Sequence, residues 1–144
     1  MEKQRVVVIG FLLNEDLKVL VVRRSKKSKI LPKYYELPGG KVEFREEPEA
    51  ALQREFLEET GLKVRICNPF HVCSYDWEQE ASRQSIAITY FVQPLRAECL
   101  RDIKITLSDE HSDYKWANME MLKLLKIHEN ARKAIEFGLR SCCK

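Results

Sequence analysis

Aliphatic and β-branched residues form short runs at the start of the chain, each followed by polar residues. Val6–Leu13 and Leu17–Arg24 are two such runs, separated by Asn14-Glu15-Asp16, and this spacing predicts a β-hairpin. A basic, polar loop is expected next. Tyr34–Leu37 then predicts a short strand, which ends at Pro38-Gly39-Gly40 because proline and glycine disfavour its continuation.

The strongest helix signal in the chain covers Glu47–Thr60. Pro48 suits the first helical position, where no backbone N–H is needed, and Gly61 suits the left-handed residue that ends a helix. With about 100° of rotation per residue, the carboxylates of Glu55, Glu58 and Glu59 fall on one face of this helix.

The second half of the chain predicts mainly strands, followed by two helices. The expected strands are Leu62–Ile66, Phe70–Trp77, Gln84–Gln93, an edge strand at Ile103–Leu107, and Asp113–Ala117. The expected helices are Met119–Leu125 and Asn130–Leu139, with Asn130 as the N-cap of the second. Mostly strands with one central and one terminal helix predict an α+β fold. No repeat or linker divides residues 1–144, so a single domain is expected.

Composition and charge exclude several classes of protein. The chain has 144 residues, 44% hydrophobic and 33% charged, as expected for an ordinary globular domain. Its net charge of +3 suits the handling of small anions and argues against a nucleic-acid partner, which requires a dense basic face. Five cysteines without a C-x-x-C pair predict free thiols in a reducing compartment.

No apolar run approaches the about 20 residues of a membrane span, so no membrane partner is expected. Val6–Leu13 follows two basic residues, as a signal core would, but no small-residue cleavage site comes after it. A strand is the better interpretation, and a cytoplasmic location is expected. The sequence leaves open whether the protein is a monomer or a homodimer.

The acidic face of the central helix requires an explanation. Like charges at i, i+3 and i+4 destabilise a helix by roughly 0.2–0.5 kcal/mol per pair. Glu55, Glu58 and Glu59 therefore oppose the helix that carries them, unless a cation offsets their charge. Mg²⁺ takes carboxylate oxygens, waters and phosphate oxygens, which makes the three glutamates a candidate metal site. The alternative is a solvated acidic surface.

Neighbouring residues favour the metal site. Arg54 lies one turn before Glu58 and can hold that carboxylate by an i, i+4 pair. Gly39 and Gly40 allow close approach of the backbone, so a glycine carbonyl could join the ligands. Glu46 is expected to steady the loop ahead of the helix rather than to bind metal.

The pattern G-x5-E-x7-R-E-U-x-E-E-x-G-U, where U is a bulky apolar residue, matches the chain from Gly40 onward. The matching residues are Gly40, Glu46, Arg54, Glu55, Phe56, Glu58, Glu59, Gly61 and Leu62. This stretch resembles the Nudix box, and Phe56 is its one departure, since an aliphatic residue is more usual there. That difference concerns packing and not chemistry.

The resemblance implies a fold and an activity. Nudix proteins are α/β/α sandwiches with a mixed sheet, in which the box forms a loop–helix–loop. They hydrolyse a nucleoside diphosphate linked to another moiety and use Mg²⁺ or Mn²⁺. Carried over to this chain, the carboxylates of Glu55, Glu58 and Glu59 and the carbonyl of Gly39 would bind the metal, and Arg54 would orient the glutamates.

The resemblance also suggests where the catalytic base lies. A carboxylate must take the proton of the attacking water, and Glu55 is one candidate. Glu110 is the second, because some relatives carry an acidic residue six positions ahead of a Trp, as Glu110 is ahead of Trp116. The alternative for Glu110 is a solvated loop residue. His111 beside it is interpreted as a surface histidine.

Substrate choice depends on residues outside the box. Markers that accompany ADP-ribose or dinucleoside-polyphosphate preference are missing at Asp76-Trp77-Glu78 and at residues 78–80. This favours a nucleoside triphosphate or modified nucleotide, in a MutT-like pyrophosphohydrolase. The alternatives are a hydrolase of ADP-ribose or an NDP-sugar, of a dinucleoside polyphosphate or of an RNA 5′ end, and a non-catalytic nucleotide-binding module. Asn130 could read the base or cap its helix, and the lysines at 26, 27, 29 and 33 could steer polyphosphate.

Overall fold

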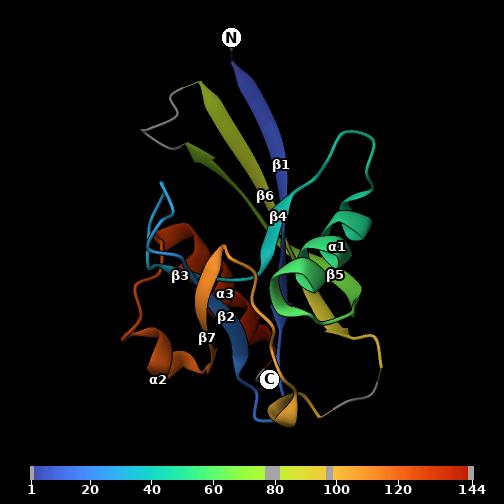
Figure 1. The fold of residues 1–144 in the computed structure, drawn as a ribbon, viewed down its shortest axis with the longest axis vertical. Helices are drawn as coiled ribbons and strands as arrows, with labels where there is room; N and C mark the ends of the chain where they lie inside the picture. Colours follow the sequence, from blue (N-terminus) through green and yellow to red (C-terminus); the bar gives the residue numbers. More distant parts are fainter. Residues whose placement is uncertain (1, 77–81, 97–98, 143–144) are drawn as a thin grey trace.

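Two β-sheets and two longer helices make up the fold (Figure 1). The computed structural model describes residues 2–76, 82–96 and 99–142. In chain order the elements are β1 (Lys3–Leu12), β2 (Val19–Arg24), β3 (Tyr35–Glu36), β4 (Gly39–Lys41), α1 (Pro48–Thr60), β5 (Val64–Asp76), β6 (Arg83–Pro94), the short 3₁₀ helix η2 (Leu100–Asp102), β7 (His111–Ala117), α2 (Met119–Leu122) and α3 (Glu129–Cys142).

The larger sheet is mixed and the smaller one is antiparallel. The larger has the order β4-β1-β6-β5, and β1 runs parallel to β6 from Lys3↔Arg83 to Leu12↔Val92. The smaller has the order β3-β2-β7, with both pairs antiparallel. The predicted α+β class with a mixed sheet is therefore confirmed.

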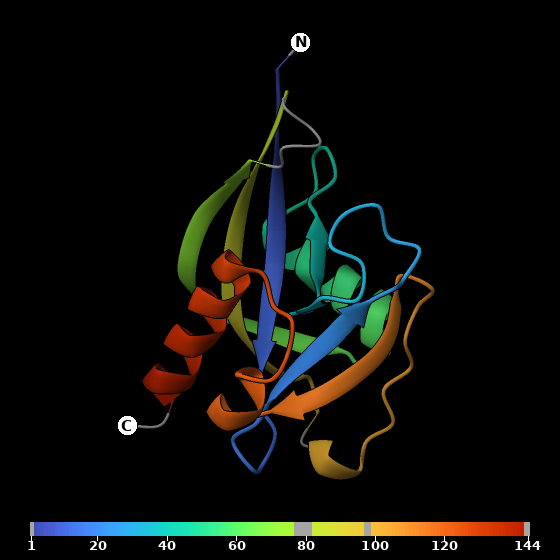
Figure 2. The same cartoon turned by 90° about the vertical axis from the view of Figure 1, so that its left-hand side faces the viewer.

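Strand β1 separates two cores. Its residues alternate between faces, so Gly10 and Phe11 point in opposite directions. A Cβ on Gly10 would lie 2.6 Å from the Phe56 ring of α1, and a Cβ on Gly138 of α3 would lie 2.6 Å from the Phe11 ring. Helices α1 and α3 thus cover opposite faces of the mixed sheet (Figure 2), which confirms the predicted α/β/α sandwich.

The predicted β1–β2 hairpin is wrong, although a turn does join the two strands. The Asn14 side chain accepts hydrogen bonds from the N–H groups of Asp16 and Lys18, which closes the turn. Beyond the single bridge Leu13↔Val19, β1 and β2 diverge into different sheets. Since Val19–Val22 is fully buried, β2 needs apolar cover on both faces, and a two-stranded ribbon cannot provide that.

Helix α1 follows its sequence signals closely. It begins at Pro48, the first helical position, and ends before Gly61, whose φ of 76° is left-handed. The Gly61 N–H donates to the Leu57 carbonyl. Leu52 and Phe56 are fully buried and fix the helix against the sheet. The predicted loop–helix–loop form of the box is confirmed.

Several boundaries differ from the sequence prediction. The two strands expected at Leu62–Ile66 and Phe70–Trp77 are one strand, β5, with register shifts on both sides of Pro69; Trp77 lies outside the described residues. No strand forms at Ile103–Leu107, because the Thr106 N–H donates to the Thr60 carbonyl at the end of α1, 2.9 Å away. Strand β4 was not predicted.

Asn130 does not cap the last helix. Helix α3 begins at Glu129, so Asn130 lies inside its first turn. The Asn130 N–H donates to His128 Nδ1 over 3.2 Å, which gives His128 the capping position. The sequence did not indicate His128 as the N-cap, because a histidine ring nitrogen is an uncommon cap.

Two bulk expectations can be compared with the structure. Cys67, Cys73 and Cys99 are free thiols, as predicted, and Cys143 lies outside the described residues. Within the described part of the chain, none of the helices is long and apolar enough to cross a membrane.

Candidate active site

The acidic face of α1 is held against strand β4 by two hydrogen bonds. The Gly39 N–H donates to Glu59 Oε1 over 2.9 Å, and Arg54 Nη2 donates to the Lys41 carbonyl over 3.1 Å. A Cβ on Gly40 would lie 2.3 Å from the Glu55 carboxylate carbon, so no side chain fits there. The two glycines therefore set how closely the carboxylates approach the backbone of β4.

These glycines yield a paired prediction. Gly40→Ala should leave the protein folded, because the clash is with the end of a flexible side chain, but it should displace the Glu55 carboxylate and weaken metal binding about tenfold. Gly39→Ala should instead destabilise the fold by about 1–3 kcal/mol, because its Cβ would lie 2.2 Å from the backbone carbonyl oxygen of Val8. Urea denaturation and calorimetric metal titration measure both effects. Equal stability losses in the two variants would contradict the prediction.

Arg54 links the loop before α1 to the glutamates. Its Nε and Nη2 donate to the two carboxylate oxygens of Glu46, each over 2.9 Å. Its Nη1 donates to Glu55 Oε1 over 2.9 Å and lies 3.5 Å from Glu58 Oε2. Glu46 also accepts from the Glu43 N–H, and hydrogen bonds from Arg54 lower the pKa of Glu46 to about 2. Glu46 thus steadies the loop, as the sequence suggested.

The three helix glutamates differ in exposure. The side chains of Glu59, Glu55 and Glu58 are 4%, 14% and 56% exposed. Burial raises the pKa of Glu59 to about 9, despite the opposing hydrogen bond from the Gly39 N–H. Burial also raises the pKa of Glu55, although Arg54 acts in the other direction. The carboxylates of Glu55 and Glu59 therefore lie in a setting that disfavours their negative charge.

The interpretation of His111 as a surface histidine is wrong. Its side chain is 2% exposed, and Nε2 lies 2.8 Å from Glu36 Oε2. Nδ1 lies 3.6 Å from Glu59 Oε2. The pairing of β7 with β2 sets His111 opposite Arg24 and so brings it beside the box helix. This contact between distant segments left no signal in the local sequence.

Glu110 lies next to the box glutamates, although it comes from a distant loop. Its backbone carbonyl accepts a hydrogen bond from the Ser25 N–H over 2.9 Å. The side chains of Glu59, Glu110 and His111 each offer a ligand atom, and these atoms lie within 4.8 Å of one another. The structure thus brings Glu110 to the place expected of a site residue, while its role is still a prediction.

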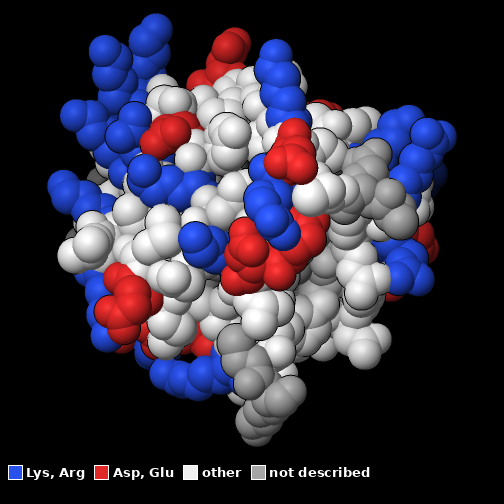
Figure 3. Space-filling view, turned by 90° about the horizontal axis from the view of Figure 1, so that it is seen from below, with Lys and Arg blue, Asp and Glu red and all other residues white. Residues whose placement is uncertain are grey.

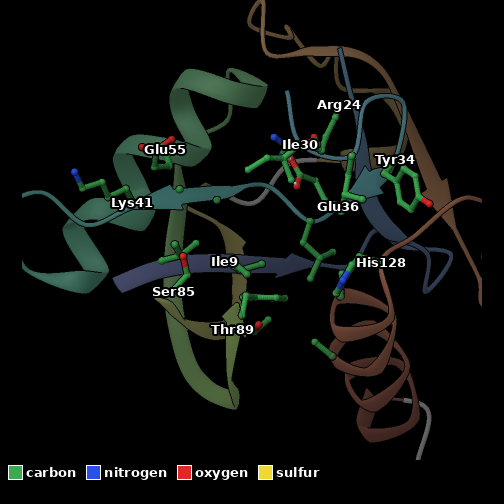
Figure 4. A pocket seen from close by; sticks show the side chains of 18 of the residues that line it. Ile9, Arg24, Ile30, Tyr34, Glu36, Lys41, Glu55, Ser85, Thr89 and His128 are labelled. Carbon is green, nitrogen blue, oxygen red and sulfur yellow. Dashed lines mark hydrogen bonds and ion pairs between the residues drawn. The ribbon is translucent and has the colours of Figure 1, made fainter. Parts of the chain in front are cut away.

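A cavity of about 360 Å³ runs from the box helix to the start of α3 (Figure 4). Glu55 and Lys41 lie at one end of it, and His128 lies at the other. Tyr34, Tyr35 and Tyr75 add aromatic surface to its lining, whereas Asn130 is absent from that lining. The aromatic lining was not predicted, since it comes from two segments, at residues 34–35 and at Tyr75, that meet only in the folded chain.

Further lining residues come from the loop after β2. Ile30 and Leu31 line the cavity, and the lysines at 26, 27, 29 and 33 do not. Arg24 and Glu36 also line it and form an ion pair of 3.0 Å, which no sequence signal indicated. The loop thus contributes apolar surface to the cavity, and a steering role for its lysines is still a prediction.

The donor set matches a divalent cation. Carboxylate oxygens together with a nearby backbone carbonyl are the ligands preferred by Mg²⁺ and Mn²⁺. Glu55 and Glu59 line the cavity, whereas Glu58 lies outside its lining and is held near Arg54. The residues present therefore fit such an ion at the acidic end of the cavity.

Comparison with known proteins agrees with this geometry. The family model for the NUDIX domain matches residues 3–137. The 8-oxo-dGTP diphosphatase of Escherichia coli (strain K12) is 32% identical over 52% of this chain and 57% of its own length. The 8-oxo-dGTP diphosphatase of Proteus vulgaris is 30% identical over 64% of this chain and 79% of its own length.

The structure also resembles solved structures. The crystal structure of the MutT protein from Methanosarcina mazei Go1 matches with a TM-score of 0.82 and 26% identity, covering 99% of this chain and 98% of that chain. The alignment with the Escherichia coli relative spans little more than half of that protein. Because the family match extends over nearly the whole sequence and includes every residue of the box, the chain belongs to the Nudix family.

Proposed function

We propose that this protein is a divalent-metal-dependent pyrophosphohydrolase of nucleoside triphosphates, acting as one domain over residues 1–144. The observation that supports it best is the cavity, which has the carboxylate-rich face of α1 at one end and aromatic side chains toward the other. A triphosphate requires the first feature and a nucleobase the second. The two relatives named 8-oxo-dGTP diphosphatase favour the same substrate class.

The metal ligands in this proposal are the carboxylates of Glu55, Glu58 and Glu59 and the carbonyl of Gly39, with Mg²⁺ or Mn²⁺ as the ion. A bound divalent ion supplies charge neutralisation of the phosphate oxygens and lowers the pKa of the attacking water. Arg54 fixes the helix carboxylates through its hydrogen bond to Glu55 and its contact with Glu58.

Proton removal from the attacking water and binding of the phosphates depend on side chains at the acidic end of the cavity. One carboxylate takes the proton of the attacking water; Glu55 and Glu110 are the two candidates, and both line the cavity. Lys41, at the same end, places a positive charge where a phosphate would lie. Water attacks the α- or the β-phosphorus, and the bridging P–O bond between these two phosphates breaks. Pyrophosphate leaves in the first case and the nucleoside monophosphate in the second, and its negative charge is stabilised in this electrostatic environment.

The face of the molecule in Figure 3 gives no support for an RNA substrate. Lysine and arginine side chains are interspersed with acidic ones on that face and do not form one broad basic surface. Long nucleic acids bind through many phosphate contacts, which require such a surface. A small nucleotide needs only the few charges at the end of the cavity.

The experiment is a substrate panel with purified protein and Mg²⁺. It contains dNTPs, 8-oxo-dGTP, NDP-sugars, ADP-ribose, dinucleoside polyphosphates and capped RNA, with products identified by mass spectrometry. We expect a nucleoside monophosphate and pyrophosphate from a triphosphate, with no turnover in EDTA. Reaction in H₂¹⁸O locates the phosphorus attacked. Turnover restricted to ADP-ribose, dinucleoside polyphosphates or capped RNA would overturn the substrate class, and binding without turnover would indicate a nucleotide-binding module.

A further inference from the structure

The strongest feature left unexplained by the box glutamates is His111. Its side chain is 2% exposed, and its Nδ1 has no hydrogen-bond partner among the described residues. Leaving a buried polar atom unpaired costs about 1–3 kcal/mol, so such an atom calls for a partner that the polypeptide does not supply. Nδ1 faces Glu59 Oε2 at 3.6 Å, which is too long for a hydrogen bond.

The second ring nitrogen shows which tautomer is present. Nε2 lies 2.8 Å from Glu36 Oε2, and an ionised carboxylate can only accept, so Nε2 carries the ring proton. Arg24 Nη1 donates to both oxygens of Glu36, over 3.0 and 3.3 Å, and keeps this carboxylate in place. The lone pair of Nδ1 is then free to bind a cation. A carboxylate on the far nitrogen is the usual arrangement around a metal-binding histidine.

We propose that His111 Nδ1 binds a divalent transition-metal ion together with the carboxylates of Glu59 and Glu110. The inference rests on the proposed metal dependence and adds a nitrogen donor to it. In a shell with bonds of about 2.1 Å, neighbouring ligand atoms lie about 3–4 Å apart. The distance of 3.6 Å between Nδ1 and Glu59 Oε2 fits that spacing, and the group as a whole lies within 4.8 Å. Only a small movement of the exposed Glu110 side chain is needed.

This donor set has a consequence for metal choice. Mg²⁺ binds oxygen almost exclusively, whereas first-row transition ions accept imidazole nitrogen. The protein should therefore bind Mn²⁺ more tightly than a site of carboxylates alone would. The backbone of His111 belongs to strand β7, and its ring is held by the contact of Nε2 with Glu36. Little conformational freedom of the side chain is therefore lost when the ion binds.

The test is electron spin echo envelope modulation on the full chain loaded with Mn²⁺. We expect ¹⁴N modulation from a bound imidazole, which changes to the ¹⁵N pattern when the protein is made with ¹⁵N-histidine. His111→Gln should lose the nitrogen signal and raise the Mn²⁺ dissociation constant about tenfold, while the constant for Mg²⁺ changes less than about threefold. His71→Gln, a substitution in strand β5, is the matched control and should keep the signal.

The outcomes separate this inference from the proposed function. Mn²⁺ bound without any nitrogen signal would overturn the role of His111 and leave the metal-dependent hydrolase standing. No Mn²⁺ binding at all would overturn this inference, while the absence of Mg²⁺-dependent turnover in the substrate panel would overturn the proposed function. If His111→Gln fails to fold, the histidine that gives the nitrogen signal can be identified by replacing the other two, since the chain has three histidines. A signal that disappears in His71→Gln or His128→Gln would then contradict the proposal, and retention in both would support it.

Discussion

Replacing Glu58 with glutamine is expected to lower kcat at least about a thousandfold while leaving the protein folded. The loss of one proposed carboxylate ligand should weaken the charge stabilisation on which phosphoryl transfer depends. The fold should tolerate the change because the Glu58 side chain is 56% exposed and its ion pair with Arg54 is 3.5 Å long. Exposed pairs of this kind contribute at most about 1 kcal/mol.

The measurement is steady-state turnover of the best triphosphate from the panel, alongside the thermal unfolding midpoint. Glu49→Gln is the matched control, since it removes a negative charge from the exposed first turn of the same helix. We expect that control to retain turnover within about twofold. Full activity of Glu58→Gln, or turnover in EDTA by either variant, would refute the proposed metal site.

Glu59→Gln is expected to abolish activity and at the same time stabilise the metal-free protein. Burial raises the pKa of Glu59 to about 9, from an ordinary value of 4.5. Between these two values the unfolded chain holds fewer protons than the folded one, so stability falls as pH rises from about 4.5 to about 9. At pH 7 the cost is on the order of 3 kcal/mol. A glutamine side chain does not ionise, so the variant avoids this free-energy cost, and its amide oxygen still accepts the hydrogen bond from the Gly39 N–H.

Urea denaturation in EDTA at a series of pH values tests this prediction. The wild-type protein should lose stability across that pH range, and Glu59→Gln should show a flatter profile and higher stability at pH 7. Divalent ions should stabilise the wild type alone, because the variant lacks a ligand. A variant less stable than the wild type at pH 7 in EDTA would show that the carboxylate is not strained by its burial.

The box helix could be predicted because its signals are local. Pro48 and Gly61 mark its ends, and the spacing of its glutamates places them on one face regardless of the rest of the fold. The same holds for Glu46, whose contact with Arg54 lies within the loop and helix of the box. Here the sequence contains the information in one continuous stretch.

The aromatic end of the cavity and the histidine contact could not be predicted in this way. His111 contacts Glu59 only because β7 pairs with β2. Strand β2 in turn shares a single bridge, Leu13↔Val19, with the end of β1 and then joins the other sheet. The hairpin prediction failed at the same point, since a short turn is compatible with paired or diverging strands. Long-range pairing decides between them, and it depends on the burial of Val19–Val22 from both sides.

The way in which separate segments line the cavity has a consequence for protein engineering. The residues proposed to carry the hydrolytic chemistry lie on α1, at Gly39, and at Glu110 and His111, whereas Leu31, Tyr34, Ala131 and Ala134 reach the cavity from other segments. Libraries randomised at these four positions would alter the shape available to a base without altering the carboxylates. Directed evolution toward damaged or unnatural nucleotides can therefore begin there and keep the reaction itself unchanged.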